Sequence, residues 1–172
     1  MTKKKRGKSE KKVDKTLESI CKSSSTLSPW FKPGFQAIKK EYRGKIKVSD
    51  TKLLGGSVDF DMALQQGNEK ENRWDYGFDY EGNLIFIEFH PAQTSEIKCI
   101  IKKVEFTEGW LKNNCPEILS LPKFEKGNRQ FYWVATNNVG ILGSSNIARR
   151  FALKRIKMVG SVFDYEKLKN KE

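Results

Sequence analysis

The sequence predicts an α/β (α+β) domain in which a mixed four-stranded sheet is flanked by helices. Three consecutive segments in the middle of the chain have the hydrophobic pattern of strands, which indicates an antiparallel meander. A segment with helical spacing separates the third strand from a fourth, and such a crossover favours parallel pairing between those two strands. Helical patterns also lie near both ends of the chain. The expected order is therefore helix, helix, three strands, helix, strand, helix.

Two short helices are expected before the sheet. In the first, apolar side chains recur at helical spacing, at Val13, Leu17, Ile20 and Cys21. A loop rich in serine and proline follows it. The second helix is predicted from about Phe35 to Tyr42, with Ile38 on the same inward face and Gly44 after its end.

The three strands of the meander are predicted over residues 58–64, 74–80 and 84–89. In the first two, apolar residues alternate with polar or small ones, which is the pattern of a strand with one buried face. The third is almost continuously apolar, so we expect it to be central and covered on both faces. Glu81-Gly82-Asn83 marks the turn between the second and third strands.

The second half of the chain supplies a crossover helix, a fourth strand and a last helix. Thr94 or Ser95 can cap the crossover helix, whose inward face holds Ile97, Ile100, Ile101, Val104 and Leu111. The fourth strand is predicted over Phe131–Ala135. Ser144 or Ser145 can cap the last helix, with Ala148, Ala152, Ile156 and Val159 facing inward. The other side of that helix is expected to carry Arg149, Arg150, Lys154 and Lys157.

Composition and charge favour a single globular domain with a polyanionic partner. The chain has 172 residues with eleven Phe and four Trp, enough for one core, and the domain is expected over residues 13–172. The net charge of +12 indicates a polyanion as the partner, either nucleic acid or an anionic membrane, and nucleic acid is preferred because no helix is both strongly basic and exposed-apolar. About half of the excess positive charge lies in a predicted disordered basic arm over residues 1–12, which contains Lys3, Lys4, Lys5 and Arg6. This arm would contact phosphates, keep the protein soluble or, in a eukaryote, direct it to the nucleus.

Several classes of protein are not indicated. The sequence contains no signal peptide and no membrane-spanning run, so we expect a cytoplasmic protein, nuclear if eukaryotic, without a membrane partner. The three cysteines form no CxxC pair, and their spacing therefore indicates neither a disulfide framework nor a zinc site. The oligomeric state is left open.

The turn after Tyr80 sets the register of the central hairpin. A loop of two or of four residues gives the same pairing, and in both cases Asp75 faces Glu88 with the two Cβ atoms about 5 Å apart. Two carboxylates so close need a bound cation, a shared proton or a nearby Lys or Arg. Glu88 is the less easily explained of the two, because an unpaired carboxylate inside an apolar strand is costly.

Carboxylate oxygens at such close quarters suit Mg²⁺ or Mn²⁺, with Asp75 and Glu88 as the ligands. A metal there would polarise a phosphoryl oxygen and lower the pKa of a bound water. His90, the only histidine of the chain, projects from the same face. It could donate to a phosphate, orient a water or bind the metal.

Three features carry a family resemblance, and one of them is the continuation of the fold by a helix and the strand Phe131–Ala135. Arg73-Trp74-Asp75-Tyr76 and the run from Gly82 to His90 resemble the Pro-Asp and the turn, apolar strand and Glu-x-Lys of the PD-(D/E)xK nuclease superfamily. The resemblance implies a restriction-endonuclease-like core, a metal held by Asp75 and Glu88, and a lysine that positions the attacking water. His90 stands in place of that lysine, so the role would fall to His90 itself or to Lys98 or Lys102 of the next helix. Some families with this fold add an acidic residue on the first helix, for which Glu41 is the candidate.

Three functions follow from these observations. The first is a metal-dependent nuclease that hydrolyses DNA or RNA, with the basic arm and the last helix on phosphates. The second is a catalytically inactive nucleic-acid binder on the same fold. The third is a protein-interaction subunit of a larger complex, with Trp30, Phe31 and Trp110 marking the partner surface.

Overall fold

The centre of the protein is a mixed sheet of six strands rather than four. The computed structural model describes residues 15–141 and 143–170, so the predicted basic arm with Lys3, Lys4, Lys5 and Arg6 lies outside the described residues. The six strands lie side by side in the order β1 (Phe31–Lys32), β3 (Leu54–Asp59), β4 (Tyr76–Tyr80), β5 (Asn83–His90), β6 (Phe131–Ala135) and β7 (Ile156–Met158). A separate two-stranded sheet pairs β2 (Ile46–Lys47) with β8 (Phe163–Asp164).

Strand directions agree with the prediction. The pairs β1–β3, β3–β4 and β4–β5 are antiparallel, whereas β5–β6 and β6–β7 are parallel. Helix α4 (Ile97–Asn114) connects β5 to β6 as the expected crossover. The hairpin register is also confirmed, because Tyr80 pairs with Asn83 and Tyr76 with Ile87. The turn between them has positive φ at both Glu81 and Gly82, as a two-residue hairpin turn requires.

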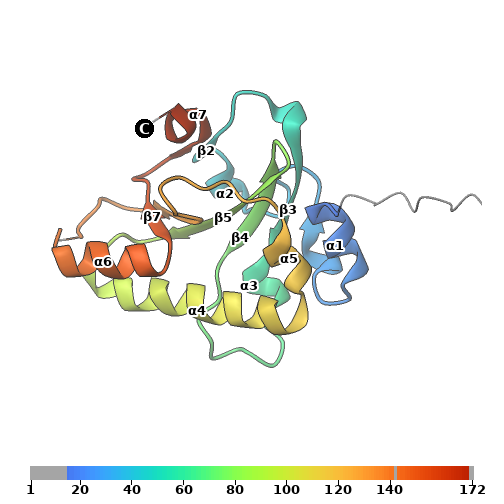
Figure 1. Ribbon diagram of the computed structural model, residues 1–172, viewed down its shortest axis with the longest axis horizontal. Coiled ribbons are helices and arrows are strands. Elements are labelled where there is room, and N and C mark those ends of the chain that lie inside the picture. Colours follow the sequence, from blue (N-terminus) through green and yellow to red (C-terminus); the bar gives the residue numbers. More distant parts are fainter. Residues whose placement is uncertain (1–14, 142, 171–172) are drawn as a thin grey trace, which may run out of the picture.

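Helices cover both faces of the sheet (Figure 1). One face carries α4 together with α1 (Leu17–Ser23), α3 (Phe60–Ala63), α5 (Pro116–Ser120) and α6 (Ser145–Leu153). The opposite face carries α2 (Lys40–Arg43), the small β2–β8 sheet and α7 (Tyr165–Asn170). Single turns of 3₁₀ helix form η1 (Ser28–Trp30), η2 (Thr51–Leu53) and η3 (Thr94–Glu96). No helix among the described residues combines the length and apolar character needed to cross a bilayer.

Strand β5 separates two apolar cores. Leu84 and Phe86 belong to the core beneath α4, whereas Ile85 and Ile87 belong to the core on the other face. The strand is therefore buried on both sides, as its continuous apolar run predicts. By the same alternation, Glu88 is directed to the face that α4 covers.

The strand predicted over residues 58–64 ends at Asp59. The Asp59 side chain accepts a hydrogen bond from Met62 N (2.9 Å) and so caps α3, which turns the chain away from the sheet. Phe60 is then buried against Phe86, at 5.7 Å between ring centroids. The prediction of a strand beyond Asp59 is therefore wrong, because a helix cap and a buried aromatic ring stabilise a helical turn there.

The second predicted helix is shorter than residues 35–42. Residues before α2 form turns instead, because Ala37 N donates to Ser57 Oγ (3.1 Å) on β3 rather than to a helical carbonyl. Ile38 is nevertheless fully buried, as predicted for the inward face. Tertiary hydrogen bonding has here replaced the local helical pattern.

The last helix is shorter than predicted, because α6 ends at Leu153, before two of the four residues predicted for its inward face. Ser144 caps α6 as expected, with its Oγ accepting from Ile147 N (3.2 Å), but Arg155 takes a positive φ and the chain continues as β7. Ile156 is buried as a strand residue. The side chains of α6 that pack on the core are Ile147 and Phe151, not the predicted Ala148 and Ala152, which are exposed. Val159 also follows β7 rather than belonging to the helix.

Candidate functional site

Glu88 lies in the middle of the sheet with no solvent-exposed surface. It belongs to β5, between β4 and β6, and it pairs with Trp133 of β6. The relative exposure of its side chain is 0 %. A carboxylate buried in this way needs partners, because an unpaired charge in an apolar interior is strongly unfavourable.

Asp75 supplies part of that partnership through two reciprocal hydrogen bonds. Asp75 N donates to Glu88 Oε2 (2.8 Å), and Phe89 N donates to Asp75 Oδ2 (3.1 Å). These bonds fix both carboxylates against the backbone where β4 begins. Each carboxylate keeps one further oxygen, Asp75 Oδ1 and Glu88 Oε1, for another partner.

Lys103 of α4 contacts both of those remaining oxygens. Its Nζ lies 3.0 Å from Asp75 Oδ1 and in direct contact with Glu88 Oε1. The side chains of Lys103 and Asp75 are only 12 % and 17 % exposed, so the cluster is largely shielded from water. The structure therefore brings Asp75 and Glu88 together, as the register predicts, and places an ammonium between them. We refer to these three residues as the Asp75–Glu88–Lys103 cluster.

Burial and charge perturb the protonation of the cluster in opposite ways. Burial, and then the charge of Asp75, raise the pKa of Glu88 well above its ordinary value, although Lys103 and the Asp75 N–H lower it in part. Burial by itself would lower the pKa of Lys103, but Glu88 and Asp75 outweigh burial and raise it. Lys103 is therefore held as an ammonium. Perturbed groups of this kind are typical of functional sites.

A polar cavity of about 210 Å³ adjoins Asp75. It is lined by Lys39, Tyr42, Asp59, Asp61, Met62, Asp75, Tyr76 and Phe89. Burial raises the pKa of Asp59 to about 6, with the Met62 N–H opposing the shift and the charges of Asp61 and Asp75 adding to it. The cavity gives Asp75, unlike Glu88, a path to solvent and to small ligands.

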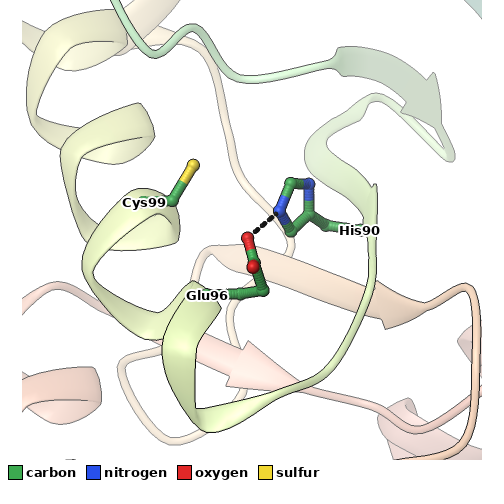
Figure 2. Close-up of side chains that lie close together, drawn as sticks. All are labelled: His90, Glu96 and Cys99. Carbon is green, nitrogen blue, oxygen red and sulfur yellow. Dashed lines mark hydrogen bonds and ion pairs between the residues drawn. The ribbon is translucent and has the colours of Figure 1, made fainter.

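His90 extends the cluster toward α4. Its Nδ1 lies 3.6 Å from Glu88 Oε1, and its Nε2 lies 2.7 Å from Glu96 Oε2. Figure 2 shows His90 and Glu96 directed toward each other, with Cys99 beside them on the first turn of α4. His90 therefore stands on the same face as Glu88, as predicted.

The lysine that the structure brings to the two carboxylates is neither Lys98 nor Lys102. Lys98 and Lys102 are exposed on α4, and Lys103 is the lysine that contacts the carboxylates. The helical period indicates that Lys103 faces the sheet, since it lies three residues after Ile100 and four before Thr107, both buried. Glu41 is exposed on α2.

The four basic residues predicted to form one nucleic-acid-binding face of the last helix lie on different elements. Arg149 and Arg150 are exposed on α6, as expected. Lys154 follows that helix and pairs with Glu105 of α4 (2.7 Å), while Lys157 lies in β7. Of these four basic residues, Arg149 and Arg150 thus form a short exposed pair, and the four do not make a continuous helical face.

Of the aromatic residues predicted to mark a partner surface, Phe31 is buried, whereas Trp30 and Trp110 are only partly buried. Phe31 is 8 % exposed and lies in the core beneath α4, and Trp30 and Trp110 pack against that core. The protein-interaction surface therefore stays a prediction, with Trp30 and Trp110 as its partly exposed members.

Comparisons of the chain with protein-family models, with curated proteins and with solved structures found no match. The resemblance to a nuclease superfamily therefore stays a prediction. The geometry of the Asp75–Glu88–Lys103 cluster is what a functional proposal has to explain.

Proposed function

We propose that the protein is a metal-dependent nuclease that hydrolyses phosphodiester bonds of DNA or RNA. The observation that carries the proposal is the convergence of Asp75, Glu88 and Lys103, two carboxylates and an ammonium, beside a polar cavity. A structural ion pair does not need a third charge or an adjoining cavity. A site that binds a divalent cation and a phosphate uses all of these features.

The strand order supports a restriction-endonuclease-like core. The antiparallel β3–β4–β5 meander is followed by the α4 crossover and the parallel strand β6. Asp75 directly precedes β4 and Glu88 lies near the end of β5, the places in which the superfamily resemblance expects the two acidic residues. In this proposal Lys103 takes the role of the superfamily lysine from the following helix.

The donor set fits Mg²⁺ or Mn²⁺. Asp75 Oδ1 and Glu88 Oε1 are hard oxygen donors held near one point, since both contact the same Nζ. Each oxygen has a second lone pair beyond the one used by Lys103. Asp75 and Glu88 would hold the ion, which would supply charge for a phosphoryl oxygen and a bound water of lowered pKa.

The other groups of the site have roles that follow from their charge and position. The Lys103 ammonium donates hydrogen bonds and can hold a water or a phosphate oxygen beside Asp75. His90 lies between Glu88 and Glu96, and its ring nitrogens can form hydrogen bonds to a water or a phosphate at the site. The net charge of +12, including Arg149 and Arg150, attracts the phosphate backbone.

A non-catalytic nucleic-acid binder is the second candidate, and one observation favours it. Lys103 already compensates the carboxylates, so the charges are partly balanced without any added cation. Such a protein would bind nucleic acid with a steep salt dependence and leave it intact. Replacing both Arg149 and Arg150 by Ser should reduce the slope of log affinity against log salt by about two in either case, if each contacts one phosphate.

Cleavage of end-labelled single- and double-stranded DNA and RNA tests the proposal. The purified protein should cut at least one of these substrates with Mg²⁺ or Mn²⁺ and lose the activity in chelator. Glu88→Gln should lower the rate at least about 100-fold, the effect typical of removing one group that stabilises transition-state charge. Glu117→Gln, the same change at a distant surface position on α5, should leave it unchanged.

Intact substrate at high enzyme and metal concentration would overturn the nuclease proposal. If salt-sensitive binding persisted in that experiment, the second candidate would hold. Thermal unfolding of Glu88→Gln must show a folded protein, so that loss of cleavage reports the site and not the fold.

A further inference from the structure

A second group of potential ligands lies next to the Asp75–Glu88–Lys103 cluster. His90 ends β5, Glu96 lies in η3 and Cys99 lies on the first turn of α4, and Figure 2 shows the three side chains together. One imidazole nitrogen, one carboxylate oxygen and the thiol sulfur all lie within 4.8 Å of one another. Three different donor types therefore meet at one point.

We infer that His90, Glu96 and Cys99 form a binding site for a transition-metal ion of the Zn²⁺ class. Nitrogen and sulfur donors together with a carboxylate suit Zn²⁺, Co²⁺ or Fe²⁺, whereas Mg²⁺ takes oxygen ligands. Cysteine spacing along the sequence does not indicate this site, because only one cysteine contributes to it. The fold assembles it by bringing the end of a strand against the start of a helix.

The surroundings of His90 are those of a metal-binding histidine. Its Nε2 faces Glu96, while its Nδ1 faces the buried Glu88 at 3.6 Å. A ligating histidine commonly presents its second nitrogen to a carboxylate, which fixes the ring and its tautomer. Glu88 is in position to do this, since its carboxylate is held by Asp75 N and Lys103.

The site is accessible and needs only a small adjustment. The side chains of His90 and Glu96 are 23 % and 33 % exposed. Their 2.7 Å separation is shorter than the roughly 3.3–3.5 Å between ligand atoms around a tetrahedral Zn²⁺, so the Glu96 carboxylate must withdraw slightly. The Cys99 thiol, which now donates to Asn72 Oδ1 (3.3 Å), would bind as thiolate and release its proton to solvent.

Three protein ligands leave one tetrahedral position open. Structural zinc sites fill all four positions with protein ligands, whereas sites that bind water or an anion keep one free. The open position would face water or an anionic ligand beside the carboxylate cluster. Metal binding here stands independently of the nuclease proposal, because it needs neither Mg²⁺ nor cleavage.

The single histidine makes the test direct. In tag-free protein labelled with ¹⁵N, the imidazole-nitrogen signals belong to His90 alone. One equivalent of Zn²⁺ should shift the Nε2 resonance and raise the unfolding midpoint. Cys99→Ser and Glu96→Gln should each weaken Zn²⁺ binding by at least about 10-fold, while Glu117→Gln should leave it unchanged.

Co²⁺ provides a second readout through its thiolate charge-transfer absorption. Cys21 and Cys115 are buried, at 0 % and 5 % exposure, so a thiolate band in folded protein points to Cys99. Cys99→Ser should abolish the band. Asp75→Asn should keep it, which separates this site from the carboxylate cluster.

An unshifted Nε2 resonance at stoichiometric Zn²⁺ would overturn the inference. So would a shift that persists unchanged in both Cys99→Ser and Glu96→Gln, because the ion would then be held elsewhere. Both variants replace partly exposed side chains, and their unfolding curves show whether a lost signal reflects lost folding.

Discussion

Each end of the β4–β5 hairpin has a glutamate that contacts a lysine, but the glutamate at the turn is exposed and the one at the other end is buried. At the turn, exposed Glu81 accepts from Lys169 Nζ (3.0 Å) and Tyr165 Oη (2.8 Å) of α7. These bonds to Lys169 and Tyr165 lower the pKa of Glu81. At the other end, burial raises the pKa of Glu88 despite its contact with Lys103. A basic partner alone therefore does not decide the state of a carboxylate, and burial outweighs it at the inner end.

The contrast bears on function because a buried ion pair is a poor stabiliser. The desolvation cost of two charges can exceed their attraction, and apolar residues of similar size often serve stability equally well. The outer pair is solvated and costs little. The inner cluster is therefore the one that calls for a functional explanation, and each of the following changes breaks or sharpens the comparison.

The largest stability effect is expected at the inner lysine. Lys103→Met removes the ammonium and leaves Glu88 and Asp75 buried together, which should cost about 3–5 kcal/mol of unfolding free energy. Lys169→Met, the same change at the outer pair, should not move the urea midpoint measurably. Equal midpoints for the two variants would show that burial does not distinguish the pairs.

Removing the inner glutamate charge should repair part of that loss. Glu88→Gln combined with Lys103→Met should be more stable than Lys103→Met alone by about 1–3 kcal/mol, since the two residues interact directly. Urea unfolding of the wild type, both single variants and the double variant gives the coupling energy. Additive effects would contradict direct coupling.

The smallest effect is expected in the titration of the outer glutamate. Lys169 is the main cause of the lowered pKa of Glu81, so Lys169→Met should raise that pKa toward its ordinary value. A lowered folded-state pKa contributes stability above the unfolded-state pKa and loses it as pH falls through the folded value. The variant should therefore lose less stability on acidification. Carboxyl ¹³C NMR titration measures the shift, and an unchanged Glu81 pKa would count against this pairing.

The sequence could predict those parts of the site that local rules determine. Alternation and a two-residue turn are sufficient to set Asp75 opposite Glu88, because a one-residue slip would reverse every side chain. The helical period identifies the buried face of α4, and it also holds the signal for Lys103. By the same period, Lys98 and Lys102 lie on the exposed face of α4.

Other features depend on contacts between distant segments. Strands β1 and β8 have two residues each and β7 has three, too few for a hydrophobic period, and they exist through their pairing partners. The end of β3 depends on the Asp59 cap, and the end of α6 on the positive φ of Arg155. The group of His90, Glu96 and Cys99 likewise forms only when η3 and α4 fold back beside the end of β5.

The most direct test of the central claim compares two aspartates, one directly before β4 and one within it. Asp75 belongs to the inner cluster, whereas Asp79 of β4 accepts from Gly82 N (3.0 Å) at the turn. The measurement is the Mg²⁺- or Mn²⁺-dependent cleavage rate of Asp75→Asn and Asp79→Asn beside the wild type. The account predicts a loss of at least about 100-fold for Asp75→Asn and a rate near wild type for Asp79→Asn. Equal rates for the two folded variants would contradict it.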